Sequence, residues 1–171
     1  DIGLGIVLFV LFRKMRFISH KSMKFHVLKI SQSLTTVKKR EYFSKRLLVW
    51  INACVIEKVE YYKQNGYFIC LSTAAPICYA KWIGKHLRFN GVLATPMPCD
   101  KWEENIREKK KDNTLVYLIH QNASLEILLT DHYDDVPLLS VPKERNYIVN
   151  PSLKTINMLN EYHIEYVLLE N

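Results

Sequence analysis

Short apolar runs alternate with segments of helical spacing from residue 67 to the end of the chain, and this alternation limits the fold most strongly. The runs that read as strands are residues 67–71, 90–96, 126–130 and 146–150, and residues 164–170 read as a last strand or helix. Strand–helix alternation with short connections is typical of a parallel sheet with helices on both faces. The sequence therefore predicts an α/β fold with a three-layer, Rossmann-like core.

The first third of the chain has a different pattern. Residues 17–62 carry apolar side chains at steps of three and four, with Lys and Arg between them. Gly66 can end such a helix because glycine readily takes a positive φ. We therefore expect a helical region over residues 1–60 and an α/β core over residues 61–171.

The basic charge is concentrated in this helical region. Residues 1–66 hold 13 Lys and Arg against 4 Asp and Glu, whereas the rest of the chain holds 11 against 13. A basic half can bind nucleic acid, an anionic membrane or phosphorylated substrates, or it can simply be a solvated surface. The chain has no aromatic–basic motif of the kind that binds RNA or DNA, so a nucleic-acid-binding module is disfavoured.

The apolar run at residues 4–12 is too short for a membrane span, which needs about 20 residues. It also lacks the preceding basic segment of a signal peptide. Membrane contact through residues 2–12 is therefore not favoured, although a protein whose last span ends near Arg13 would have the same pattern. The four cysteines lack zinc-site spacing, which fits free thiols and a cytoplasmic location.

Three carboxylates follow the apolar run 126–130, in the segment TDHYDDVPLL. Asp131, Asp134 and Asp135 would repel one another unless a cation, a solvated turn or a helix N-terminus separates or balances them. Asp134 reads as a solvated neighbour, and His132 more readily as an exposed turn histidine than as a catalytic one. Asp135 can serve equally as a metal-site residue or as an acid at the start of a helix from Val136.

Hydroxyl residues follow the other expected strands. Ligands of parallel sheets bind beyond the carboxyl ends of the strands, so these residues should lie at one edge with Asp131 and Asp135. Ser72 and Thr73 are candidates for contact with a ligand, and each is also a candidate helix N-cap. Thr95 reads more readily as a loop or strand-end residue.

These motifs, in this order, resemble the haloacid dehalogenase superfamily and most closely its phosphoserine-phosphatase-like branch with a helical cap. The resemblance covers about residues 60–160 and includes ICLS, TDHYDDVPLL and the Asn-Pro pair at 150–151. It implies a cap over residues 1–60 and Mg²⁺-dependent hydrolysis of a small phosphorylated substrate. Ser72 and Thr73 would then contact the phosphate, and Asp131 and Asp135 would form the Mg²⁺ site.

In that family an Asp nucleophile at the end of the first, central strand attacks phosphorus, and a second Asp two residues later is the general acid and base. The corresponding Asp-x-Asp-x-Thr motif is absent from the sequence. The resemblance would place it upstream of Asp1, and it implies that this chain is inactive and that its sheet is open in the middle.

The family's phosphate-binding Lys is the second departure. It should lie in residues 101–121, which are expected to be helical, and the alignment puts Asn105 at or near its place. Lys101, Arg107 and Lys109 are alternatives that the sequence does not separate. Since Asn cannot neutralise a phosphate, Asn105 favours the alternative of a catalytically dead relative used for binding or regulation.

Overall fold

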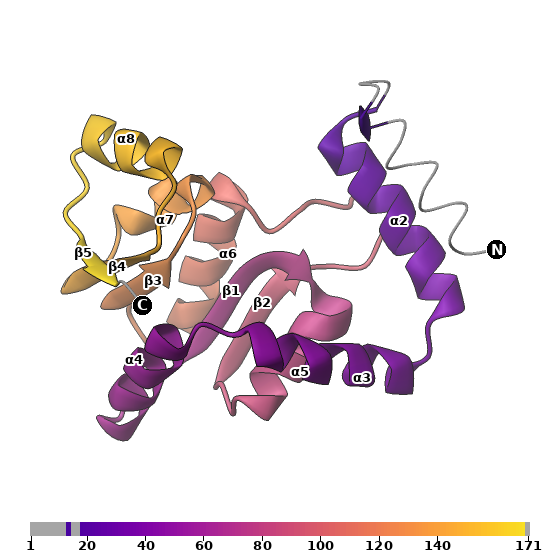
Figure 1. The fold of residues 1–171 in the computed structure, drawn as a ribbon, viewed down its shortest axis with the longest axis horizontal. Coiled ribbons are helices and arrows are strands. Elements are labelled where there is room, and N and C mark those ends of the chain that lie inside the picture. Colours follow the sequence, from indigo (N-terminus) through magenta and orange to yellow (C-terminus); the bar gives the residue numbers. More distant parts are fainter. Residues whose placement is uncertain (1–12, 15–17, 170–171) are drawn as a thin grey trace.

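The computed structural model describes residues 13–14 and 18–169 (Figure 1). The helices are α2 (His20–Leu34), α3 (Val37–Leu47), α4 (Ala53–Gln64), α5 (Ile77–His86), α6 (Arg107–His120), α7 (Val136–Leu139) and α8 (Leu153–Glu161), with 3-10 helices η1 (Leu48–Trp50) and η2 (Tyr133–Asp135). The strands are β1 (Cys70–Pro76), β2 (Gly91–Thr95), β3 (Ile127–Thr130), β4 (Arg145–Val149) and β5 (Val167–Leu169). The expected membrane contact through residues 2–12 lies outside the described residues. Within the described part, no helix has both the length and the apolar character needed to cross a bilayer.

All strand pairings are parallel. β1 pairs with β2, and β4 lies between β3 and β5. Among the described strands, no hydrogen-bonded ladder joins β1 to β3, so a two-stranded and a three-stranded sheet result. The predicted α/β class, with parallel strands flanked by helices, is confirmed.

The described part of the helical region is divided into three helices, α2, α3 and α4. Each helix begins at a polar N-cap whose side chain accepts a hydrogen bond from the backbone, at Ser19, Thr36 and Asn52. Such caps satisfy amide groups that a helix N-terminus leaves without partners. The expected boundary after residue 60 falls inside α4, which continues to Gln64.

β1 begins later than expected. Gly66 takes φ +82° and ends α4, and the Tyr67 amide donates to Tyr62 O as part of the same turn. This turn occupies the residues predicted as the start of the strand, so β1 runs from Cys70 to Pro76. Residues 101–106 likewise precede α6 instead of belonging to it.

Helix α2, at the right of Figure 1, lies beyond the carboxyl ends of β1 and β2. Lys24 Nζ of this helix donates to Ala74 O at 2.8 Å and pairs with Glu104 Oε2 at 2.6 Å. The Glu104 side chain is 6% exposed. This buried ion pair holds α2 at the edge where the strands end, which we call the carboxyl edge.

The apolar core lies between the three-stranded sheet and the helices that follow β3 and β4. Its buried side chains are Val136, Leu139, Ile148 and Leu159. Partly buried Leu128, Met158, Ile164 and Tyr166 pack against them. The core therefore joins β3, β4, α7 and α8, and the acidic segment lies between two of these elements, β3 and α7.

We expect Gly84→Ala to lower the free energy of unfolding by about 1–3 kcal/mol, the usual cost of overpacking a core. Gly84 is buried in α5, and an added Cβ would overlap Val92 Cγ2 of β2. Val92 is β-branched and has little rotamer freedom, so the clash should exceed the helix propensity gained from Ala, about 1 kcal/mol. Urea unfolding of Gly84→Ala, Val92→Ala and the double variant would test this. Purely additive losses would contradict the proposed clash.

Candidate functional site

A buried ion pair stands at the carboxyl end of β3. Lys110 Nζ of α6 donates to Asp135 Oδ1 at 2.5 Å, and Thr130 Oγ1 donates to Asp135 Oδ2 at 2.7 Å. The side chains of Lys110 and Asp135 are 9% and 10% exposed. Both oxygens of Asp135 therefore have protein partners, and a lysine supplies the cation that the acidic segment requires. Asp135 precedes α7, but its side chain does not cap that helix.

The other two carboxylates have separate environments. Asp131 is exposed and makes no ion pair or hydrogen bond with residues in the described ranges. Asp134 was expected to be simply solvated, but it accepts a hydrogen bond from Arg107 Nε at 2.8 Å. His132 is half exposed, and its Nδ1 accepts from the Asp134 amide at 3.1 Å. The repulsion among the three acids is thus reduced by two different cations.

Ser72 and Thr73 lie inside β1, so the prediction that they follow the strand is wrong. The N-cap residue of α5 is Pro76, which also excludes them as caps of that helix. Ser72 Oγ shares a hydrogen bond with Thr114 Oγ1 at 2.8 Å, and Thr73 Oγ1 accepts from the Ala75 amide at 3.1 Å. The strand continues past Ser72 because residues up to Thr73 keep their register with β2.

Asn105 joins β1 to β2. It is 1% exposed, and its Nδ2 donates to Thr73 O at 3.1 Å and to Leu93 O and Ser72 Oγ at 3.4 Å. The backbone amide of Asn105 donates to Thr95 Oγ1 at 3.1 Å, which makes the buried Thr95 part of the same network. Asn105 therefore has a structural set of partners.

The alternatives to Asn105 lie elsewhere. Lys101 is exposed, Lys109 pairs with Glu103, and Arg107 pairs with Asp134. The lysine beside Asp135 is Lys110, which sequence reasoning missed. A signal was present, because Lys110, Thr114 and Leu118 recur at steps of four and form the buried face of α6.

The acidic segment, taken alone, does not make a metal centre. Within the described part of the chain, no group of three or more His, Cys, Asp or Glu side chains could hold a metal ion. Mg²⁺ prefers oxygen ligands and commonly uses one or two carboxylates together with water and substrate phosphate. Asp131 fits such a role because its carboxylate is free to bind, whereas both oxygens of Asp135 are engaged.

A groove of about 420 Å³ separates the two sheets. Consecutive residues leading into and along both strands line it, at 67–72 and 123–129. Successive strand residues point to opposite faces, so a groove lined by consecutive residues must reach the strand edges. We call it the β1–β3 groove. Its edges are the sides of β1 and β3 on which neither strand has a described partner.

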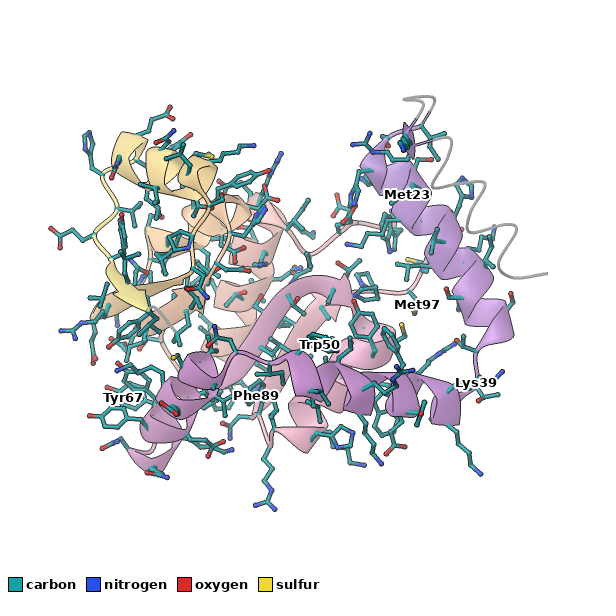
Figure 2. The ribbon with its side chains drawn as sticks, in the orientation of Figure 1. Met23, Lys39, Trp50, Tyr67, Phe89 and Met97 are labelled. Atoms are coloured by element: carbon teal, nitrogen blue, oxygen red, sulfur yellow. The ribbon has the colours of Figure 1, made fainter. Side chains whose placement is uncertain are left out.

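Both ends of the β1–β3 groove carry polar side chains, and the stretch between them is apolar. Tyr67 and Phe89, labelled in Figure 2, line it near the start of β1. Ser72, Thr114 and Asp135 line the end toward which the strands run. Ser124 and Glu126 add polar atoms at the start of β3. The groove is therefore apolar along its middle and polar at both ends, with the Lys110–Asp135 pair at the carboxyl edge.

We expect Cys70 to react much more slowly than Cys99 with a thiol reagent at pH 8. Burial raises the pKa of the Cys70 thiol to about 11, which leaves roughly a hundredfold less thiolate than the usual pKa of a thiol, about 9, would give. Cys99 is exposed, and none of the four cysteines forms a disulfide. Ellman kinetics on the native protein, with Cys99→Ser as control, measure this. Equally fast labelling of Cys70 would contradict the burial.

Comparisons with known proteins establish only the fold. No protein-family model matches the chain, and no curated protein matches it. A crystal structure from Bordetella pertussis Tohama I, described as a protein with unknown function, is similar with a TM-score of 0.75. The match covers 94% of this chain and 78% of the Bordetella chain, at 16% sequence identity. At this identity the likeness concerns the arrangement of the backbone.

Proposed function

We propose that this chain belongs to a haloacid-dehalogenase-like, Mg²⁺-dependent phosphatase of small phosphomonoesters. In this proposal a strand occupies the β1–β3 groove and brings an aspartate nucleophile to the carboxyl edge. The observation that carries the proposal is the position of the groove, an apolar opening between two parallel sheets that ends beside a buried lysine. Parallel strands buried on both faces are apolar along their length, which is the lining that the middle of the groove offers.

The residues at the carboxyl edge suit phosphoryl transfer. Lys110 would offset the charge of the phosphate and of the incoming carboxylate, since both would lie in a region of low solvent exposure. The Ser72 hydroxyl, which lines the groove at the carboxyl edge, would donate to a phosphate oxygen. Asp135 would position Lys110. Asp131 would help to hold Mg²⁺, which supplies charge neutralisation at the phosphate when bound.

The presence of Lys110 also weakens the case for a catalytically dead relative. That alternative depended on Asn105 standing where a cation is needed. Asn105 instead clamps the two strands of the smaller sheet, and a lysine five residues later lies beside the acidic segment. The proposed role of the chain therefore requires one further component, the nucleophile, which the sequence does not contain.

The test is to express the natural reading frame that contains these residues and to assay phosphate release from p-nitrophenyl phosphate with Mg²⁺. We expect turnover by that protein and none by the 171-residue chain. Asp131→Asn should abolish turnover without unfolding the protein, because Asp131 is exposed. Lys111→Gln, on the same helix as Lys110, is the matched control and should remain active. Mg²⁺-dependent turnover by the 171-residue chain, or full activity of Asp131→Asn, would overturn the proposal.

A further inference from the structure

Helix α3 and η1 carry several exposed aromatic and aliphatic side chains, away from the proposed active site. Five large apolar side chains there are 49% to 85% exposed. They are Val37, Tyr42, Phe43, Val49 and Trp50. Single exposed apolar residues are ordinary, but a cluster of this kind on a short segment indicates an interaction surface. Figure 2 labels Lys39 and Trp50 toward the two ends of this segment.

Basic residues share the same side of the helix. Lys38, Lys39, Lys45 and Arg46 are all exposed. The helical repeat places Lys39, Tyr42 and Arg46 on one face at steps of three and four, while Ser44 on the opposite face is fully buried. Lys39, Tyr42 and Arg46 therefore share one outward face. We call this face, with exposed Lys38 and Lys45 beside it and exposed Val49 and Trp50 of η1, the α3 outer surface.

The surroundings reinforce the positive charge. Glu41 is the one acidic residue in α3, η1 and the neighbouring α5, and it pairs with Lys45 at 3.5 Å. Helix α5 contacts α3 through the Phe43 and Tyr79 rings, whose centroids are 5.4 Å apart. α5 adds exposed Lys81 and Lys85. A partner must consequently be anionic and must also accept apolar side chains.

We propose that the α3 outer surface binds peripherally to membranes rich in anionic phospholipid. Short helices that mix Lys and Arg with exposed aromatic residues lie in the membrane interface, and Trp is favoured at the depth of the headgroups. Basic residues near an anionic bilayer are attracted by its surface potential. Both kinds of side chain on this surface gain from a lipid partner.

Charge and polarity argue against two other occupants. A second copy related by a two-fold axis would bring the same basic surface against itself, and like charges would repel. Nucleic acid would pair with Lys and Arg, but Val49 would gain nothing from a phosphate backbone. The anionic lipid surface is the partner that complements the charge and also buries the apolar side chains.

The test measures partition of the 171-residue chain onto vesicles of phosphatidylcholine alone or mixed equally with phosphatidylserine. We expect binding to the mixed vesicles and release by salt. Lys38→Gln/Lys39→Gln/Arg46→Gln should lower the partition coefficient about a hundredfold, since each charge contributes about fivefold. The matched control Lys101→Gln/Lys143→Gln/Lys154→Gln removes equal charge elsewhere and should change it less than about threefold, because distant charges are screened.

The apolar contribution is tested separately. Trp50→Ser should weaken binding and abolish most quenching by brominated phospholipid, whereas Ile119→Ser, at a residue 70% exposed on α6, should do neither. All these residues are exposed, so the variants should keep the far-ultraviolet spectrum of the parent chain. Equal partition onto both vesicle types, or equal losses from the surface and control variants, would overturn the proposal. The proposal would also be overturned if the surface variants lost self-association or duplex DNA binding while their binding to vesicles stayed unchanged.

Discussion

Asp135→Ala should lower the free energy of unfolding by about 3–5 kcal/mol, a loss measurable by urea denaturation at neutral pH. The substitution leaves the Lys110 ammonium buried without its counter-ion, and it removes the acceptor of the Thr130 hydroxyl. Uncompensated buried charge costs more than the net value of the pair, because desolvation is no longer offset. The expected loss is therefore a large fraction of the stability of a domain this size.

The control for this prediction removes both partners. Lys110→Met/Asp135→Leu replaces the pair with apolar side chains of similar size, and such replacements are often neutral or stabilising. We expect the double variant to be more stable than either of its single variants, Asp135→Leu and Lys110→Met. A double-mutant cycle gives the coupling between the two residues. Losses that add without coupling would show that the two side chains do not share a buried environment.

Local pattern was sufficient for most strands and for the class of the fold. The apolar run before Asp131 and the helix start at Val136 are where the sequence placed them, because short connections and buried strands leave clear patterns. The errors fall at boundaries. The turn that ends α4 delays β1, and caps at Thr36 and Asn52 divide the long helical segment. These caps depend on side-chain hydrogen bonds that apolar periodicity does not encode.

The candidate site was harder to predict than the fold. Asp135 was identified because it follows a predicted strand, but its partner required knowledge of which side of α6 faces inward. The segment from Arg107 to Lys111 contains four basic residues, of which Lys110 is buried. Likewise Asn105 looked like a substitution for a cation, whereas its burial against two strands shows a structural role. Tertiary packing decides both cases.

The β1–β3 groove and the buried ion pair have opposite effects on the stability of the larger sheet. The groove leaves apolar strand edges exposed, which favours association with other strands. The Lys110–Asp135 pair and the core beneath β3 and β4 hold the larger sheet together beside that opening. Stability of the larger sheet should therefore depend strongly on its few fully buried side chains.

Leu159→Ala should accordingly lower the free energy of unfolding by about 2–5 kcal/mol, the range for truncating a fully buried leucine. Leu159 of α8 is 0% exposed and packs in the core cluster with Ile148 and Leu139. The loss combines the transfer of the removed methyl groups with the cavity left between α8 and the sheet. Urea denaturation would measure this loss, provided that the dependence of the free energy of unfolding on urea concentration is the same in both proteins.

Leu153 offers a matched control in the same helix. It is 73% exposed, so Leu153→Ala removes the same atoms without opening a cavity and should change the free energy of unfolding by less than about 0.5 kcal/mol. Both substitutions raise helix propensity by the same small amount, and the difference between them isolates packing. If the two variants lowered the free energy of unfolding equally, α8 would not cover the sheet, and Leu159 would not belong to the core.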